Sequence, residues 1–284
     1  MRRLLCGLGL STALLLTGCE QLNLNTLVSG LGSLVNSVKG DGTIKSEERP
    51  LDGRFETLDI QAPIEVEYSQ SDSEKGLTLT ADSNILPLIQ TTVSNNRLLV
   101  KLAQSYDSAT EVKMLLKGPA LSEVLVSAPA KVSLLALSGK QPLSVQASGA
   151  ASVLLSGPAS DSLKLKASGS SELEIRDLSG QKLEVGLTES SSLRAYGSLD
   201  SLTLTADGAS RLLALNLRVT EAQLTFERAS KGSLTVSSRL QATLSGASEL
   251  TYGGNPQLIP NLSGASSLKP VNEAPIPATK SANP

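Results

Sequence analysis

The feature that most constrains the fold of this chain is a repeat of about twenty residues between Leu121 and Lys269. Small or polar residues mark anchor positions at Ser127, Ser148, Ser168, Thr188, Asp207, Glu227, Ser245 and Ser263, with spacings of 21, 20, 20, 19, 20, 18 and 18. From Ser148 onward an apolar residue stands five positions after the anchor, and only Gly232 breaks that column. A fixed period of this length is typical of a solenoid, whose repeats bury their apolar edges against their neighbours.

Within a repeat, apolar and polar residues alternate, as in Ser162–Ala167, Lys182–Leu187 and Ser201–Ala206. Alternation at period two indicates strands and excludes helical repeats. It predicts that Leu202 and Leu204 point inward. We therefore predict an all-β fold, a right-handed parallel β-helix-like solenoid with coils of about twenty residues.

A column of small side chains lies two positions after the anchors, at Ser170, Ser190, Ala209, Ala229 and Ala247. Equivalent residues of stacked coils lie ~4.8 Å apart, so bulky residues do not fit at crowded corners. We expect the column to pack inward. In the alternative, it faces outward and forms a flat stripe against which a partner or glycan could lie.

The N-terminus has the pattern of an export signal in residues 1–18. Arg2 and Arg3 precede the apolar stretch Leu4–Leu16, which is too short to span a membrane as a helix. The stretch ends in Leu-Thr-Gly-Cys19, which resembles the lipobox of bacterial lipoproteins. The resemblance implies acylation of Cys19 and membrane attachment through acyl chains. It predicts a lipid-anchored cell-envelope protein, in the outer rather than the inner membrane if the cell has both.

Composition limits the chemistry of the mature chain. Removal of Arg2 and Arg3 leaves 23 basic against 27 acidic residues, a net charge of −4, which argues against nucleic acid as a partner. Histidine is absent and Cys6 lies within the signal, so Cys19 would be the one remaining thiol. We expect no metal and no cofactor.

The rest of the chain divides by composition. Residues 19–41 form a lipidated tether with apolar residues at helical spacing: Leu24, Leu27, Val28, Leu31, Leu34, Val35 and Val38. A short capping helix, a flexible tether and contact with the membrane interface all fit this pattern. Residues 42–120 form the N-terminal half of the β domain, 121–269 the repeat half, and 270–284 a Pro-rich tail that we predict to be disordered.

Several motifs resemble a known family. Glu48–Phe55 leads into Leu58–Val66, Asn84–Ile89 follows, and repeated Ser-Gly-Ala-Ser comes after them. This order is similar to that of the head GIN domain family of adhesin-like proteins, formerly a domain of unknown function. The resemblance covers about residues 42–269. It implies a β-helix-like fold on an exported, often lipid-anchored bacterial protein, and it transfers no functional residues.

Candidate catalytic groups are few. Asp207 and Glu227 share the anchor position in successive coils, but Arg211 and Lys231 stand four residues after them, so a surface ion-pair ladder explains all four. Without histidine, a serine nucleophile would need a lysine base such as Lys131 or Lys231. The candidate sugar-stacking residues are Tyr106, Tyr196 and Tyr252. We expect no catalytic residues.

Three functions in different classes stay open. The first, which we favour, is a lipid-anchored, non-catalytic binding or adhesin-like module, with an envelope glycan or a surface protein as partner. The second is a structural envelope protein without a soluble ligand. The third is a carbohydrate-active enzyme, which would need two of the three tyrosines to share a groove with Asp207 or Glu227.

Overall fold

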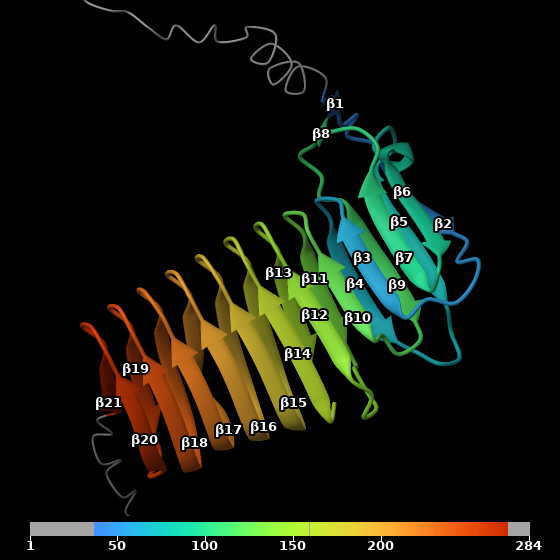
Figure 1. Cartoon of the computed structure of the whole chain (residues 1–284). Helices are drawn as coiled ribbons and strands as arrows, with labels where there is room; N and C mark the ends of the chain where they lie inside the picture. Colours follow the sequence, from blue (N-terminus) through green and yellow to red (C-terminus); the bar gives the residue numbers. More distant parts are fainter. Residues whose placement is uncertain (1–36, 159, 272–284) are drawn as a thin grey trace, which may run out of the picture. The chain divides into compact units, whose positions relative to one another are not determined.

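The computed structural model describes residues 37–158 and 160–271. The described residues from Val38 to Val271 belong to one compact β unit, most of it stacked coils (Figure 1). Apart from one turn of 3-10 helix, the regular structure of the described residues is strand. The signal segment, Cys19 and the tail from residue 272 lie outside the described residues, as does the expected capping helix up to residue 36.

The N-terminal half comprises β1 (Val38–Lys39), β2 (Ile44–Arg49), β3 (Thr57–Gln61), β4 (Glu65–Gln70), β5 (Gly76–Asp82), η1 (Leu86–Leu88), β6 (Ile89–Ser94), β7 (Arg97–Leu102), β8 (Tyr106–Asp107) and β9 (Lys113–Gly118). The repeat half comprises β10 (Glu123–Val126), β11 (Lys131–Leu135), β12 (Leu143–Ala147), β13 (Ser152–Ser156), β14 (Ser162–Ala167), β15 (Glu172–Leu187), β16 (Ser192–Ala206), β17 (Arg211–Phe226), β18 (Lys231–Leu244), β19 (Glu249–Gly253), β20 (Gln257–Leu262) and β21 (Ser267–Pro270).

The repeat half is a parallel β-solenoid, as predicted. Each coil contributes a strand to each of two main sheets, and residues of successive coils pair in register, for example Leu163 with Leu183 and Leu183 with Leu202. In β15–β18 a shorter paired run joins the two sheets after a shift in register. We call the sheet that contains β3, β7, β10, β12, β14, the later halves of β15–β18 and β20 sheet I. Sheet II contains β4, β9, β11, β13, the first halves of β15–β18, β19 and β21.

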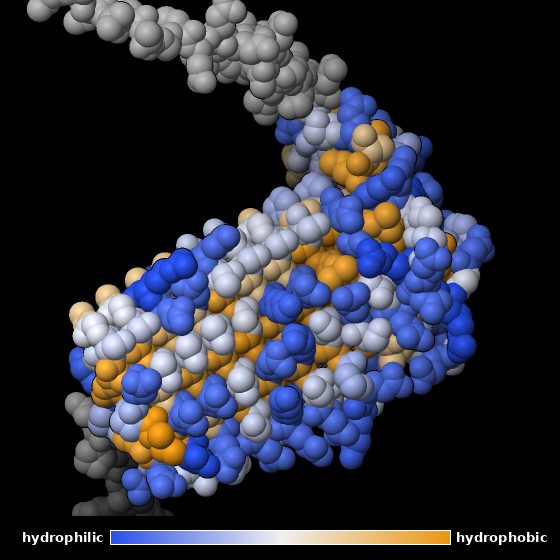
Figure 2. Space-filling model, viewed as in Figure 1, coloured by the Kyte–Doolittle hydropathy of each residue, from blue (hydrophilic) through white to orange (hydrophobic). Residues whose placement is uncertain are grey.

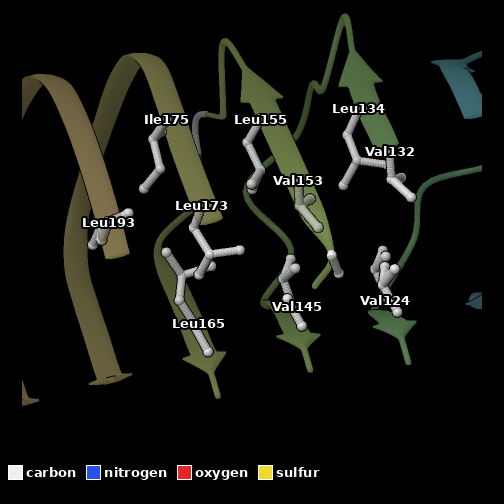
Figure 3. Packing of buried hydrophobic residues seen from close by; sticks show 14 of the residues in the cluster. Val124, Val132, Leu134, Val145, Val153, Leu155, Leu165, Leu173, Ile175 and Leu193 are labelled. Carbon is white, nitrogen blue, oxygen red and sulfur yellow. The ribbon is translucent and has the colours of Figure 1, made fainter. Parts of the chain in front are cut away.

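The core lies between the two sheets. Figure 3 shows Val124, Val145 and Leu165 of sheet I opposite Val153 and Leu173 of sheet II, all of them buried. Leu202 and Leu204 are each 1% exposed, so the predicted phase of the strand is confirmed. Burial of each such aliphatic side chain contributes roughly 1.5–3 kcal/mol.

Gly232 breaks the apolar column because a phenylalanine fills its place. A Cβ on Gly232 would lie 2.4 Å from Cζ of Phe226, whose own position holds Ala206 in the preceding coil. Large and small residues have thus exchanged places between the two sheets in this coil. Phe55 stands in the same relation to Gly118, where a Cβ would lie 2.6 Å from Cζ.

The N-terminal half begins the stack and closes its first end. Residues 61–66 (Gln-Ala-Pro-Ile-Glu-Val) and 127–132 (Ser-Ala-Pro-Ala-Lys-Val) are similar in sequence. The two segments are stacked, since β10 pairs with β3 and β11 with β4. On the other side of β3 and β4 lie β7 and β9, which antiparallel strands then cover: β6 pairs with β7, β5 with β9, and β2 with β5. Val38 and Lys39 pair with β8, so strand pairing in the described residues begins at Val38.

Candidate functional site

Each coil passes from sheet I to sheet II through a four-residue turn that starts at the anchor position. The second turn residue has a positive φ, for example 71° at Gly169, 63° at Glu189 and 81° at Gly208. The third donates its N–H to the carbonyl of the second residue one coil earlier, as Ser190 does to Gly169 at 2.9 Å. The turns are therefore hydrogen-bonded to one another along the solenoid.

The expectation that the small-residue column packs inward is wrong. Ser170, Ser190, Ala209, Ala229 and Ala247 occupy the third turn position, and all are exposed. The fourth position is the buried one, and Ser171, Ser191, Ser210, Ser230 and Ser248 there are 0% exposed. The left-handed residue before the third position directs that side chain away from the core. Two adjacent small residues gave no indication in sequence of which one faced inward.

Hydrogen bonding explains why the buried turn residue is serine. The Ser191 hydroxyl lies 2.8 Å from the Thr188 carbonyl within its own turn and 3.1 Å from the Ala167 carbonyl one coil earlier. Ser230 repeats the second contact at 2.9 Å from Ala206. A buried hydroxyl needs such partners, because an unpaired one costs about 1–3 kcal/mol. These serines are structural, and the exposed turn residues next to them are available for contact.

Of the four charged residues expected to form an ion-pair ladder, Asp207 and Lys231 form surface ion pairs among the described residues, but with partners other than those expected. Asp207 Oδ1 pairs with Nε of Arg228 at 3.0 Å rather than with Arg211. Lys231 Nζ pairs with Oε2 of Glu249 at 3.2 Å rather than with Glu227. The register explains the second pair, because Lys231 and Glu249 stand opposite each other on neighbouring strands.

The other chemical candidates do not converge. Tyr196 is exposed on sheet II, Tyr252 is half-buried opposite Leu234, and the Tyr106 hydroxyl donates to the Pro63 carbonyl at 2.8 Å. The hollow beside Tyr106 is lined by Glu65, Glu111 and Lys131 among others, and neither Asp207 nor Glu227 lines it.

The described residues offer neither a metal site nor a membrane-spanning helix. They contain no group of three or more histidine, cysteine, aspartate or glutamate side chains placed to hold a metal ion. Nor does any described helix combine the length and apolarity needed to cross a bilayer.

A hollow with a volume of about 660 Å³ lies on the outer surface of sheet I. We call it the sheet I groove. It follows two columns of outward residues along the stack: Leu125, Gln146, Lys166 and Gly186, and beside them Ser127, Ser148, Ser168 and Thr188. Asp59, Gln61 and Arg97 line it at its N-terminal end. With coils ~4.8 Å apart, the four intervals from Asp59 to Gly186 span about 19 Å.

Glycine and serine create the groove. Gly186 occupies an outward strand position, and a Cβ there would meet only Cγ of Lys166, at 4.0 Å. A glycine inside a strand often marks a close approach by another chain or ligand. Gly186 is therefore a sequence signal for this groove, which the candidate catalytic residues did not indicate.

The polar groups of the groove differ in how far they are already satisfied. Asp59, 3% exposed, accepts hydrogen bonds from Arg97 Nη1 at 3.0 Å and from the Gln61 side chain at 3.1 Å. Lys166 is exposed, and among the described residues it makes no ion pair. The nearby Glu184 is held by Lys164 at 2.6 Å, which lowers the pKa of Glu184 through that hydrogen bond and charge. The groove thus presents one unpaired cation among hydroxyl and amide groups.

A family model described as "Putative auto-transporter adhesin, head GIN domain" matches residues 54–256, which include both the groove and the turn column. The chain belongs to this family. No curated protein matches it.

Solved structures share the fold of this head GIN domain. A "putative adhesin" from Parabacteroides merdae has a TM-score of 0.74 at 22% identity, over 83% of this chain and 99% of that one. A "putative adhesin" from Parabacteroides distasonis has a TM-score of 0.72 at 19% identity, over 83% and 100%. A "putative lipid binding protein" from the same species has a TM-score of 0.70 at 19% identity, over 83% and 99%.

Proposed function

We propose that this head GIN protein is a lipid-anchored, non-catalytic binding module of the cell envelope, and that the sheet I groove holds its ligand. The family name and the similar adhesin structures support an adhesin-like role at the surface or envelope. The lipobox-like Leu-Thr-Gly-Cys19 supports an acyl anchor, in the outer membrane if the cell has two. The observation that carries the binding role is the groove itself.

The shape of the groove favours an extended ligand. Its lining residues come from successive coils in two straight columns, so an occupant would lie along the stack over about 19 Å. A glycan strand or an extended segment of a surface protein has this shape. Repeated hydroxyl and amide groups would give such a ligand a hydrogen bond at each coil.

The charge of the groove favours a ligand that carries acceptors or negative groups. Lys166 offers an unpaired ammonium group, while the carboxylate of Asp59 is already occupied by Arg97 and Gln61. A carboxylate or phosphate on the ligand would gain a charge-assisted hydrogen bond from Lys166. Lys166 therefore sets the chemical preference of the site in this proposal.

The test compares Lys166→Glu with Lys182→Glu. Like Lys166 on β14, Lys182 on β15 is an exposed lysine of sheet I, but Lys182 does not line the groove. Binding of the full-length protein to isolated envelope glycans and to isolated surface proteins would be measured for both variants. We expect Lys166→Glu to weaken binding at least tenfold, about 1.4 kcal/mol, and Lys182→Glu to leave it unchanged. Equal effects of the two variants would contradict the proposal.

A further inference from the structure

The solenoid ends at a coil that no described strand covers. β20 pairs with β18 and β21 with β19, and neither has a partner on its other side within the described residues. Leu258, Ile259 and Leu262 are 38%, 37% and 47% exposed there, and Figure 2 shows the apolar patch at this end of the fold. An open apolar edge of this kind is a template for pairing with another chain.

The direction of the free peptide groups follows from the regular pattern of the stack. In sheet I, inward-facing residues present their carbonyls to the next coil: Phe226 accepts from Ser245 N–H, and Leu244 accepts from Ser263 N–H. In β20 the residues in register with the inward-facing Leu240, Ala242 and Leu244 are Leu258, Pro260 and Leu262. The peptide groups of these three residues therefore point to the free edge.

Proline occupies this edge-facing position in both of the last strands. In β20 the central residue that would present an N–H to the edge is Pro260, which has none. In β21, Val271 donates its N–H back to the Tyr252 carbonyl, so the adjacent Pro270 faces the free edge. Within the described strands these are the two prolines, and both lie in the final coil.

The same two columns hold other residues in earlier coils. The column of Pro260 contains Val185, Leu204, Leu224 and Ala242, and that of Pro270 contains Leu234 and Tyr252. Core packing alone thus accepts ordinary aliphatic or aromatic residues here. The distinguishing property of proline at these sites is its missing donor at the edge.

We propose that Pro260 and Pro270 close the C-terminal edge of the solenoid to a second copy of this chain. Two copies related by a two-fold axis would pair β20 with β20 in antiparallel fashion. With residue 260 opposite its symmetry mate, the central pair would exchange two N–H to carbonyl hydrogen bonds. Proline removes both donors, so the apolar patch stays without the backbone bonds that would fix a second copy on it.

The first test is the double variant Pro260→Val, Pro270→Val of the full-length protein in detergent, with Pro142→Val as control. Pro142 is exposed and precedes β12, away from the last coil. Sedimentation equilibrium under density-matched conditions gives the mass of each. We expect the wild type and the control to be monomeric at the concentrations used. The dimer dissociation constant of the double variant should be at least about tenfold lower than theirs. A folded double variant that associates no more than the wild type would overturn the proposal.

A second measurement needs no variant and covers the case in which the double variant fails to fold. Amide hydrogen exchange on the wild type should show the Leu258 and Leu262 N–H groups exchanging quickly, with those of Ile259 and Asn261 protected by β18. Protection of Leu258 and Leu262 at a concentration where the wild type is dimeric would show that a second copy already pairs with this edge, and would refute the closure.

Discussion

The exchange of large and small residues between Phe226 and Gly232 predicts a strong coupling between the two positions. Phe226→Ala leaves a cavity in the coil and should cost about 3–5 kcal/mol of unfolding free energy. Gly232→Leu places a side chain where even a Cβ would lie 2.4 Å from the phenylalanine ring, and should cost about 1–3 kcal/mol. If the sites were independent, the double variant would lose about 4–8 kcal/mol, the sum of these costs.

The double variant should instead be nearly as stable as the wild type. It recreates the pair Ala206 and Leu212, which stands at the same positions one coil earlier. Volume-conserving exchanges of this kind cost less than about 1.5 kcal/mol, so the coupling should be at least about 2 kcal/mol. Urea unfolding of the four proteins, followed by circular dichroism, measures it. Additive losses would refute the account of how this coil is packed.

Three further outcomes are expected. Leu204→Asp buries an unpaired charge and should cost several kcal/mol in urea unfolding, whereas Thr203→Asp next to it should cost little; equal tolerance would mean that the strand phase is wrong. Burial raises the pKa of Tyr68, whose hydroxyl donates to the Pro119 carbonyl, so its neutral form stabilises the fold below pH 10 and that contribution is lost at higher pH. Tyr68→Phe should flatten the fall in unfolding free energy above pH 10, and an unchanged slope would exclude this tyrosine as its cause. Cys19→Ser should move the protein from the membrane to the soluble fraction, whereas membrane retention without an acyl group by mass spectrometry would disprove the lipid anchor.

The repeat half of the fold was predictable because its signals are local. Residues such as Leu202 and Leu204 alternate with polar neighbours, and the same alternation recurs one period later, so sheet and register follow together. The antiparallel pairing of β5 and β6 was not predictable, because alternation indicates a strand, as it does in β5, but not which strand it pairs with. The direction of Ser170 was missed because it depends on the positive φ of Gly169 before it.

The sheet I groove was harder to predict than the fold. Its N-terminal end combines Asp59 with Arg97, 38 residues later, through the pairing of β3 with β7. In the sequence, Gly186 is only a residue with low strand propensity. In the stacked coils it pairs with Lys166, and its missing side chain leaves open space beside that lysine. Sites of this kind arise from the stacking of coils, and no single motif encodes them.

The most direct test of the binding role is to fill the groove. Gly186→Trp places an indole in the sheet I groove without crowding the backbone, since a Cβ there has only a 4.0 Å contact. Thr205→Trp is the matched control, because Thr205 pairs with Gly186 in the same outward column but does not line the groove. Binding to whole cells and to isolated envelope glycans should be lost in Gly186→Trp and kept in Thr205→Trp, with both proteins folded. Full binding by a folded Gly186→Trp protein would contradict the role of the groove.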